Sequence, residues 1–418
     1  MKGILLPSLI VTLLLLLRGG TTTAATAAET IDYAKQDEAV EDLVEWTIEK
    51  GGYFHPNVEI RRWDASDPTS YFGAFLNGSV KKDELLITIP GGIKIQLHDD
   101  YRTNSTYDDV ICVLAWELQD EYKDYIEGED GESDFEPYLY YLDQRSEHQI
   151  PAMWSEEGKK LLEKVQGKYY PRDFEADPAP GSHLHDWIQQ KYGWCLEWEG
   201  EELDEWFLAV VLQRGYDYAL IPIYDMLNHN NGDVNTITKP TIFDKNSFGV
   251  YALRDMKAGE ELLYSYYDCP DCRKCRACEE YPGTPQCKQC ESTLTYWGTS
   301  EMLRDFGFVE PYPHRYYFWN PIDEKTMLSQ GIIVDKDEEN GSYAITCFDG
   351  RCPSYELIEP LAKNLEPMFE SDILPLKDTL PPLEYFTIQR YHETLLNDFQ
   401  EFLKAVKAAN EDDSKKEL

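Results

Sequence analysis

Basic residues are scarce in this sequence of 418 residues. Its 39 lysines and arginines face 78 aspartates and glutamates, which gives a net charge of -39. A chain this acidic repels the phosphate backbone of nucleic acids, so we expect no nucleic-acid partner. The negative charge better fits binding to a basic protein segment. A well-solvated surface in an ion-rich compartment is the other explanation. The 29 tyrosines and 10 tryptophans exclude a disordered acidic chain.

Long hydrophobic runs are also lacking after residues 4–17, and no repeats or low-complexity tracts follow that run. The run is short for a membrane span and leads into small residues up to Ala28, which is typical of a signal peptide over residues 1–28. An uncleaved anchor is the alternative. After cleavage we expect no stable membrane span.

The C-terminal end of the sequence predicts a cellular location. Residues 411–418 form an acidic tail that ends in KKEL, which is close to the retention signal KDEL. With a signal peptide, this ending predicts a soluble resident of the endoplasmic reticulum lumen. A plastid reached through a bipartite leader, or secretion, are the alternatives. Sequons at Asn77, Asn104 and Asn340 are compatible with a glycoprotein.

Regular elements follow from the apolar spacing. Residues 29–52 predict an N-terminal helix that ends at a pair of glycines. Its apolar face is expected to consist of Val40, Leu43, Val44 and Ile48. Residues 71–90 predict two short strands around an Asn-Gly turn, with a buried strand at 85–89.

The middle and the end of the chain favour helices. Helical spacing recurs within residues 101–215, between charged or proline-rich loops. Residues 311–410 predict a C-terminal helical domain. One face of its last helix is expected to carry Tyr391, Leu395, Phe399 and Phe402.

Three ordered stretches carry the functional signal. In the first, residues 221–235, Asn228 and His229 follow an apolar run, so their hydrogen-bonding groups need partners. A helix-ending turn is the plain alternative. The second stretch, residues 258–268, is a strand-like run that ends in tyrosines. The third, residues 299–310, reads TSEMLRDFGFVE.

In this order the stretches resemble the C-terminal half of a SET-domain methyltransferase, of the branch related to the Rubisco large-subunit lysine methyltransferase. The resemblance covers residues 53–310 and implies an α+β SET fold. That fold has small β-sheets with a knot-like closure, a helical insertion at about 101–215 and a helical C-terminal region. The implied function is methyl transfer from S-adenosylmethionine to a protein side chain, lysine first. The alternative is a degenerate SET module that binds a protein partner without catalysis.

The resemblance also implies which tyrosine is catalytic. Tyr266 lies seven residues after Gly259, as in the strand of the family. A phenol with an unperturbed pKa of roughly 10 would orient a neutral amine rather than remove a proton. Tyr264 and Tyr267 are neighbours that the register could confuse with it, and strand alternation places Tyr264 on the same face as Tyr266.

The cofactor and substrate contacts are likewise implied by the resemblance. Asn228 and His229 would hold S-adenosylmethionine, together with the backbone of Phe72, Gly73 and Ala74. Tyr71 replaces the first glycine of the family pattern, which leaves less room for the backbone to approach a cofactor. Phe306 would line the substrate channel in place of a frequent tyrosine. Arg214 would lie beside it, with a surface or ion-pair role as the alternative.

A cysteine-rich insertion at residues 269–290 lies outside the resemblance. Cysteines two residues apart can chelate a metal or form disulfides. The six cysteines are Cys269, Cys272, Cys275, Cys278, Cys287 and Cys290. Three disulfides would use all six, whereas one zinc site would leave a pair over. A redox-active dithiol, which would make a thiol-disulfide protein, is the third alternative.

The remaining four cysteines lie apart. Cys347 and Cys352 flank a turn sequence and predict a hairpin disulfide. Cys112 lies on an apolar helix face and predicts a buried thiol, whereas Cys195 has no assignment.

Overall fold

The structure is a computed structural model. It describes residues 32–64, 70–97, 107–127, 133–144, 150–166, 192–198, 201–216, 219–230, 232–241, 246–266, 298–318, 330–337, 340–347, 350 and 352–416. Apart from Asp32, these residues belong to one compact unit, Tyr33–Leu418. The predicted signal peptide, the cysteine-rich insertion and Asn104 lie outside the described residues, as do Glu417 and Leu418 of the KKEL ending.

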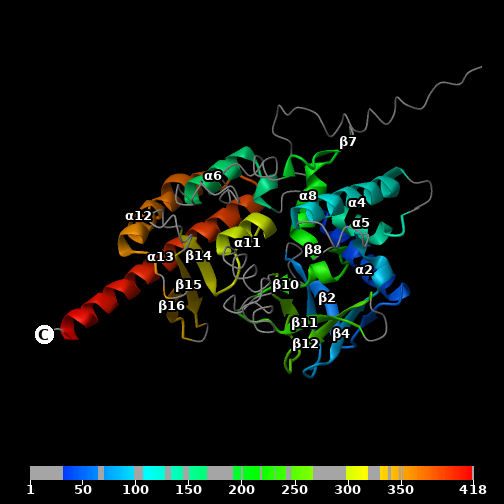
Figure 1. Cartoon of the computed structure of the whole chain (residues 1–418), viewed down its shortest axis with the longest axis horizontal. Coiled ribbons are helices and arrows are strands. Elements are labelled where there is room, and N and C mark those ends of the chain that lie inside the picture. Colours follow the sequence, from blue (N-terminus) through cyan, green and yellow to red (C-terminus); the bar gives the residue numbers. More distant parts are fainter. Residues whose placement is uncertain are drawn as a thin grey trace, which may run out of the picture. The chain divides into compact units, whose positions relative to one another are not determined.

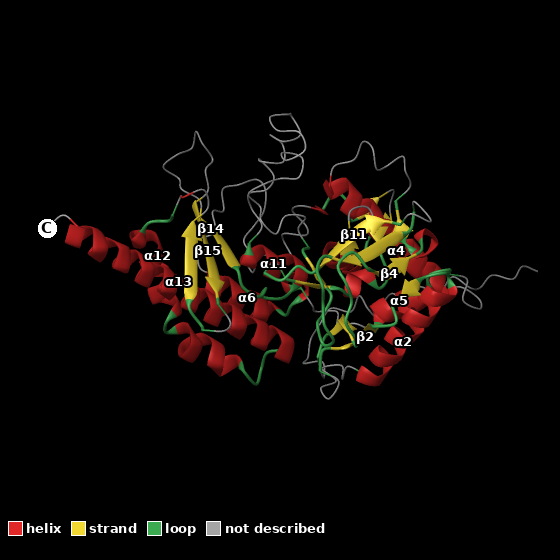
Figure 2. Cartoon of the chain, turned by 90° about the horizontal axis from the view of Figure 1, so that it is seen from below, coloured by secondary structure: helices red, strands yellow, loops and turns green. Residues whose placement is uncertain are grey.

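Helices and short strands are mixed along the chain, as the α+β prediction requires (Figures 1 and 2). The described helices are α2 (Tyr33–Glu49), α4 (Tyr107–Glu127), α5 (Glu136–Asp143), α6 (Glu156–Gln166), α8 (Glu205–Arg214), α11 (Thr299–Phe306), α12 (Tyr355–Leu365) and α13 (Pro382–Lys416). Short 3-10 turns lie at Gly91–Ile93, Pro151–Met153, Tyr224–Met226 and Leu374–Leu376, and a π-helical turn lies at Phe369–Ile373.

The strands form several small sheets. The largest has the order β1 (Tyr53–Phe54), β4 (Leu85–Ile89), β12 (Phe248–Ala252), β11 (Thr236–Pro240). Two three-stranded sheets have the orders β5 (Ile95–Gln96), β9 (Ala219–Leu220), β8 (Gly215–Tyr216), and β14 (His314–Phe318), β15 (Gln330–Lys336), β16 (Tyr343–Cys347). Pairs are formed by β2 (Val58–Arg62) with β3 (Phe72–Leu76), β6 (Glu197–Trp198) with β7 (Glu201–Glu202), and β10 (Asn228–His229) with β13 (Leu263–Tyr264).

The N-terminal helix is confirmed as α2, but its buried face differs from the predicted one. Trp46 and Thr47 are buried, whereas Ile48 is 52% exposed. A helix turns by about 100° per residue, so the face that contains Leu43 continues through Trp46 and Thr47 and leaves Ile48 outside it. The sequence pattern located the helix and placed the edge of its apolar face one residue too far.

The two strands predicted within residues 71–90 are confirmed as β3 and β4, yet they do not pair with each other. β3 pairs with β2, whereas β4 lies between β1 and β12. Leu86, Ile87 and Ile89 of β4 are completely buried. The Asn-Gly turn therefore carries the chain from one sheet to another and does not close a hairpin.

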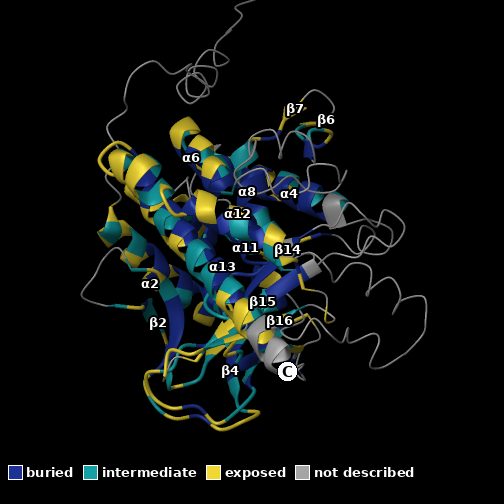
Figure 3. Ribbon diagram, turned by 90° about the vertical axis from the view of Figure 1, so that its left-hand side faces the viewer, coloured by how far each residue is buried: buried dark blue, intermediate teal, exposed yellow. Residues whose placement is uncertain are grey.

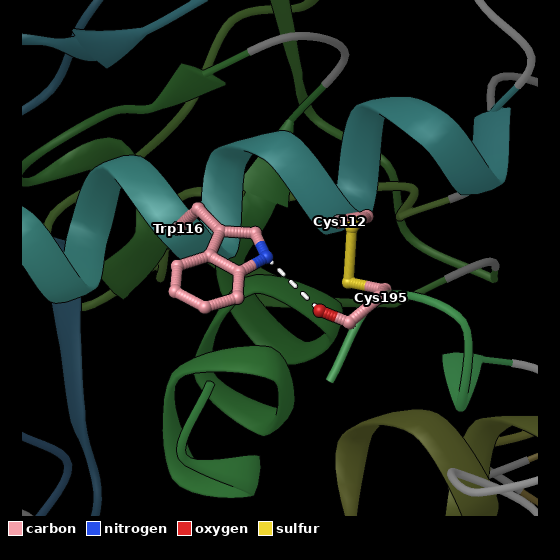
Figure 4. Close-up of a disulfide and its surroundings, with 3 residues drawn as sticks. All are labelled: Cys112, Trp116 and Cys195. Atoms are coloured by element: carbon pink, nitrogen blue, oxygen red, sulfur yellow. Dashed lines mark hydrogen bonds between the residues drawn. A yellow bond between two sulfur atoms is a disulfide. The ribbon is translucent and has the colours of Figure 1, made fainter. Parts of the chain in front are cut away.

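The region predicted as a helical insertion contains α4, α5, α6 and α8, and a disulfide that corrects the prediction for Cys112. Cys112 of α4 is bonded to Cys195, 83 residues further along the chain, and both residues are completely buried. Beside the bond, the indole Nε1–H of Trp116 donates to the carbonyl oxygen of Cys195 at 3.0 Å (Figure 4). Helical spacing identified the buried face of α4, but it cannot reveal that Cys112 bonds to a cysteine far along the chain.

The region predicted as a C-terminal helical domain contains α12 and α13, and it also contains the antiparallel sheet β14, β15, β16. Ile332 and Val334 of β15 are completely buried. Figure 3 shows this sheet beside α13, with the ribbon coloured by burial. The Phe399 ring of α13 lies 5.4 Å from the Tyr316 ring and 5.9 Å from the Phe318 ring, measured between centroids. The prediction of helices is correct there, but the sheet was missed.

The Cys347–Cys352 disulfide is confirmed, in a different setting from the predicted hairpin. It joins the last residue of β16 to the segment that precedes α12. In the part of the chain that the structure describes, no helix combines the length and the apolar character that crossing a membrane requires. Nor do its described histidines, cysteines and acids gather into a metal site.

Candidate active site

Two short parallel strands bring the predicted motifs together. β10 runs beside β13, with Asn228 opposite Leu263 and His229 opposite Tyr264. Tyr266 follows two residues after β13, so the pairing places it beside the Asn-His step. The two stretches that the sequence singled out are therefore neighbours in space.

A buried asparagine that directly precedes β11 anchors the segment of β13. The side-chain Nδ2–H of Asn235 donates to the carbonyl oxygen of Glu261 at 2.8 Å, and its Oδ1 accepts from the backbone N–H of Leu263 at 2.8 Å. Asn235 is 1% exposed. Its amide acts like one more backbone unit of the sheet, because it supplies the same donor and acceptor as a peptide group.

The amide of Asn228 is fixed by two acceptors. Its Nδ2 donates to the carbonyl oxygen of Phe72 at 3.0 Å and to Oε1 of Glu261 at 2.6 Å. A carbonyl and a carboxylate can only accept, so the nitrogen must face them and Oδ1 must point elsewhere. Among the described residues Oδ1 has no protein partner.

Gly73 makes room for this arrangement. A Cβ atom at Gly73 would lie 2.5 Å from Oε1 of Glu261 and 2.9 Å from Nδ2 of Asn228. Both distances are too short for a real contact, so a side chain at Gly73 would displace the pair. The remaining glycine of the expected loop is therefore required by contacts within the protein.

His229 positions the backbone of Tyr266. Its Nδ1 accepts a hydrogen bond from the N–H of Tyr266 at 3.0 Å, and its Nε2 lies 3.3 Å from Oε2 of Glu310. Because Nδ1 accepts, the proton of the neutral ring is on Nε2 and donates to the carboxylate. The other oxygen of Glu310 accepts from the Thr299 hydroxyl at 2.8 Å. The His229 ring is completely buried, so a cofactor contact by this residue would fall to its backbone.

The phenol of Tyr266 is held at its oxygen and along its ring. The hydroxyl donates to the carbonyl oxygen of Leu227 at 3.1 Å, so toward any further donor the phenolic oxygen can only accept. Four rings surround it, with centroid distances of 4.7 Å to Phe306, 5.0 Å to His229, 5.0 Å to Tyr264 and 6.2 Å to Phe308.

Tyr264 shares this face with Tyr266, as strand alternation predicted. Its ring also lies 4.6 Å from the Tyr224 ring. Burial, followed by the neighbouring Tyr224, raises the pKa of Tyr264 well above its ordinary value, so this phenol stays neutral. Tyr267 lies outside the described residues.

Arg214 forms a buried ion pair just before the Asn-His step. Its Nη1 lies 3.0 Å from Oδ2 of Asp225 and donates to the carbonyl oxygen of Asp225 at 3.2 Å. The Tyr138 hydroxyl also donates to Oδ2, at 3.0 Å. The sequence predicted that Arg214 lies beside the substrate channel, with a surface or ion-pair role as the alternative. These contacts are those of an ion pair. In the described part of the chain, the buried Oδ1 of Asp225 has no hydrogen-bond partner.

The backbone between Arg214 and Asn228 is strained at one residue. Ile223 has φ of 68°, in the left-handed region that a β-branched residue rarely adopts, and it is completely buried. The 3-10 turn Tyr224–Met226 follows and leads to Asn228. Strain of this kind persists only where the surroundings enforce it, and it is common at functional sites.

These groups suit S-adenosylmethionine, the cofactor that the resemblance implies. Its amino-acid part carries an ammonium group, which needs hydrogen-bond acceptors. Asn228 Oδ1 is an acceptor with no partner among the described residues. An acceptor left unsatisfied in a buried site is costly unless a ligand completes it.

Comparison with known proteins found one family model that matches part of the chain. Residues 71–267 match the family model of the SET domain. The small sheets of this segment and the helical region after it form the SET fold that the sequence predicted. No curated protein matches the sequence.

Solved structures of a methyltransferase are similar to this chain. The SET domain of LSMT bound to lysine and AdoHcy is 14% identical, with 90% of this chain and 92% of that chain covered and a TM-score of 0.45. Rubisco LSMT bound to sinefungin and monomethyllysine is 13% identical, with coverage of 89% and 92% and a TM-score of 0.44. At these identities and TM-scores the likeness carries no functional argument. The function of this chain is therefore argued from the family match and from the contacts of the site itself.

Three acidic residues of this site were not predicted from the sequence. Asp225 could have been singled out from the sequence, because the family pattern has an aspartate three residues before the Asn-His step. Glu261 follows another glutamate in a strand-like run, where a surface position is the usual expectation. Glu310 meets His229 across 81 residues, and no local pattern indicates this contact.

Proposed function

We propose that this chain is an S-adenosylmethionine-dependent protein methyltransferase, with the lysine side chain as its first candidate target. The observation that carries the proposal is the pairing of β10 with β13, which places Asn228 beside the strand that leads to Tyr266. Both residues lie within the segment that matches the SET domain.

The cofactor would be held from the side of β10. Asn228 Oδ1 would accept from its ammonium group, and backbone groups of Gly73 and His229 would contact the rest. When bound, S-adenosylmethionine supplies a methyl group on a sulfonium centre, ready for in-line displacement. The residues of the chain then have two tasks, which are to orient an amine and to exclude water.

Tyr266 would perform the first task. Its proton is committed to the carbonyl oxygen of Leu227, so the phenolic oxygen would accept a hydrogen bond from an N–H of the neutral amine. This contact leaves the nitrogen lone pair free to attack. Orientation by a fixed acceptor needs no proton transfer to the phenol.

The surrounding rings would perform the second task. Phe306, Tyr264 and Phe308 lie close to Tyr266 and offer apolar faces. A flexible amine-bearing side chain such as that of lysine can reach between such faces with its methylene groups. The acidic charge of the whole chain, -39, favours a lysine in a basic protein segment.

The test is transfer of a radiolabelled methyl group from S-adenosylmethionine to basic proteins, with Tyr266→Phe as the inactive variant. We expect Tyr266→Phe to lower the rate at least about a hundredfold, because one oriented hydrogen bond in a dry site has that order of effect. Tyr251→Phe, on the central sheet strand β12, serves as the matched control and should keep wild-type activity. Equal activity of Tyr266→Phe and the wild type would contradict the assignment.

We further propose that the protein works in the lumen of the endoplasmic reticulum. The two disulfides, Cys112–Cys195 and Cys347–Cys352, support an oxidising compartment. The sequon residues Asn77 and Asn340 are exposed, so both can carry a glycan. Protein from secretory cells should lose mass on treatment with endoglycosidase H, which cleaves the glycans of resident lumenal proteins. Glycans that resist this enzyme would contradict the proposed location.

A further inference from the structure

We propose that Glu261 is a positioning residue for cofactor binding, because its carboxylate fixes the amide of Asn228 with the oxygen directed at the ammonium group of the cofactor. This inference rests on the proposed function and adds a residue to it. Glu261 lies at the isolated bridge between Phe75 and the segment before β13, so its side chain comes from the strand that also leads to Tyr266.

The two hydrogens of Asn228 Nδ2 have distinct partners. Phe72 supplies a backbone carbonyl, which is present in any sequence, and Glu261 supplies the charged acceptor at the shorter distance of 2.6 Å. Hydrogen bonds to a charged acceptor are about twice as strong as neutral ones. The carboxylate therefore contributes most to the preference for one amide orientation over the flipped one.

Glu261 is itself held in place. Its other oxygen, Oε2, accepts from the Tyr71 hydroxyl at 3.2 Å. Burial, then the charge and the hydrogen bond of Glu261, raise the pKa of Tyr71, so its phenol keeps the proton that it donates. Tyr71 is the residue that replaces the first glycine of the family pattern. Its hydroxyl holds Glu261 in place, which a glycine could not do.

The carboxylate has no salt bridge to a lysine, arginine or histidine among the described residues. Burial raises the pKa of Glu261, and the charge of Arg61 lowers it without outweighing burial. A half-buried carboxylate that is not neutralised costs stability. Such a cost is understandable at a functional site, where the charge is kept for the amide of Asn228 that it orients.

The consequence for the cofactor follows from the geometry. With the nitrogen turned toward Glu261, Asn228 presents only Oδ1 to a ligand, which suits an ammonium donor and not a carboxylate. In the flipped orientation Nδ2 would face the ligand and repel the ammonium group. Glu261 would thus favour ligands with an amino group at this point.

The experiment is calorimetric titration of S-adenosylhomocysteine into the full-length protein and its variants. Glu261→Ala should weaken binding about tenfold, because the amide of Asn228 loses its charged partner. Glu261→Gln should fall between Glu261→Ala and the wild type, since its side-chain oxygen still accepts from Nδ2 but carries no charge. The matched control is Glu260→Ala, which removes the same charge one residue away, where the carboxylate contacts Arg254 and the N–H of Lys257.

A double-mutant cycle separates positioning from direct contact. If Glu261 acts through Asn228, then Glu261→Ala should cause no further loss in a protein that already carries Asn228→Ala. Additive losses, or a Glu261→Gln variant as weak as Glu261→Ala, would overturn the proposal. Thermal unfolding of each variant confirms that it is folded before titration.

Failure of this inference is distinguishable from failure of the proposed function. A folded wild type that does not bind S-adenosylhomocysteine would overturn the function and the inference together. Wild-type binding that is unchanged in Glu261→Ala would overturn only the role of Glu261.

Discussion

Glu261 is the residue whose chemistry most directly links the site to pH. Burial is the main cause that raises the pKa of its carboxyl, while the hydrogen bonds from Asn228 and Tyr71 and the charge of Arg61 oppose the shift. An acid with a raised pKa takes up its proton at a higher pH than usual. The site therefore loses its charged acceptor earlier on acidification than an ordinary glutamate would.

We predict that affinity for S-adenosylhomocysteine falls as the pH is lowered through the raised pKa of Glu261. The ionised carboxylate present above that pKa is the stronger acceptor for Asn228, and protonation removes its charge. The measurement is calorimetric titration at a series of pH values below neutrality. Glu261→Gln has no group that titrates there, so its profile should be flatter. Parallel profiles for the two proteins would contradict the prediction.

Acidification has the opposite effect on stability: protonation of Glu261 weakens cofactor binding but stabilises the fold. Its pKa is higher in the folded state than in the unfolded state, so the folded protein binds the proton more tightly and the free energy of unfolding rises as the pH falls through this range. At neutral pH the ionised group destabilises the fold. This opposition between binding and stability is common at functional sites.

Phe306 controls the space beside Tyr266, because their rings lie 4.7 Å apart. We predict that Phe306→Tyr shifts the products toward fewer methyl groups per lysine. The added hydroxyl would hold the amine or a water molecule and take up room that a methylated amine needs. Mass spectrometry of a methylated substrate gives the product distribution. An unchanged distribution in an active Phe306→Tyr variant would show that this ring does not line the channel.

At the residue scale the sequence singled out residues through a family pattern, and it gave no sign of the residues that are defined only by their contacts. Asn228, His229 and Tyr266 stand at fixed offsets from glycine and apolar runs, so they could be located. The use of the His229 ring to hold the backbone of Tyr266 depends on Glu310, which approaches from a distant segment. Spacing along the chain cannot reveal such a contact.

Among the elements, the disulfide between α4 and the segment at Cys195 offers a clear test. We predict that replacing Cys112 and Cys195 together with serine lowers the free energy of unfolding by about 2–5 kcal/mol, because the bond closes a long loop in the unfolded chain. Denaturant unfolding measures the loss.

The second disulfide provides the control for that prediction. Cys347 and Cys352 are only 5 residues apart, so replacing this pair should cost about 2 kcal/mol less than replacing the first. Equal losses for the two pairs would contradict an account based on loop length.

Elements were predictable where periodicity identified them, and their partners were not. β3 and β4 lie where alternation and the apolar run placed them, but they belong to different sheets, because an Asn-Gly turn permits a hairpin without requiring one. The sheet β14, β15, β16 was missed because the stronger helical pattern of α13 dominated the interpretation of that region. Its strands pack on α13 through Phe399, a contact that spans more than 80 residues.

For the whole molecule, the central claim is that a SET-fold segment binds S-adenosylmethionine beside Asn228. The family match covers residues 71–267. It includes Asn228, His229 and Tyr266, whereas two of their contacts, Phe306 and Glu310, lie in the later segment 299–310. The excess of 39 negative charges concerns the partner rather than the cofactor, since it favours approach of a basic protein.

The most direct test is calorimetric titration of S-adenosylmethionine into the purified protein and into Asn228→Ala. We predict that the wild type binds and that Asn228→Ala, with an unchanged unfolding temperature, binds at least about tenfold more weakly. A folded wild type that does not bind would contradict the account, and it would favour a SET module that recognises a protein partner without catalysis.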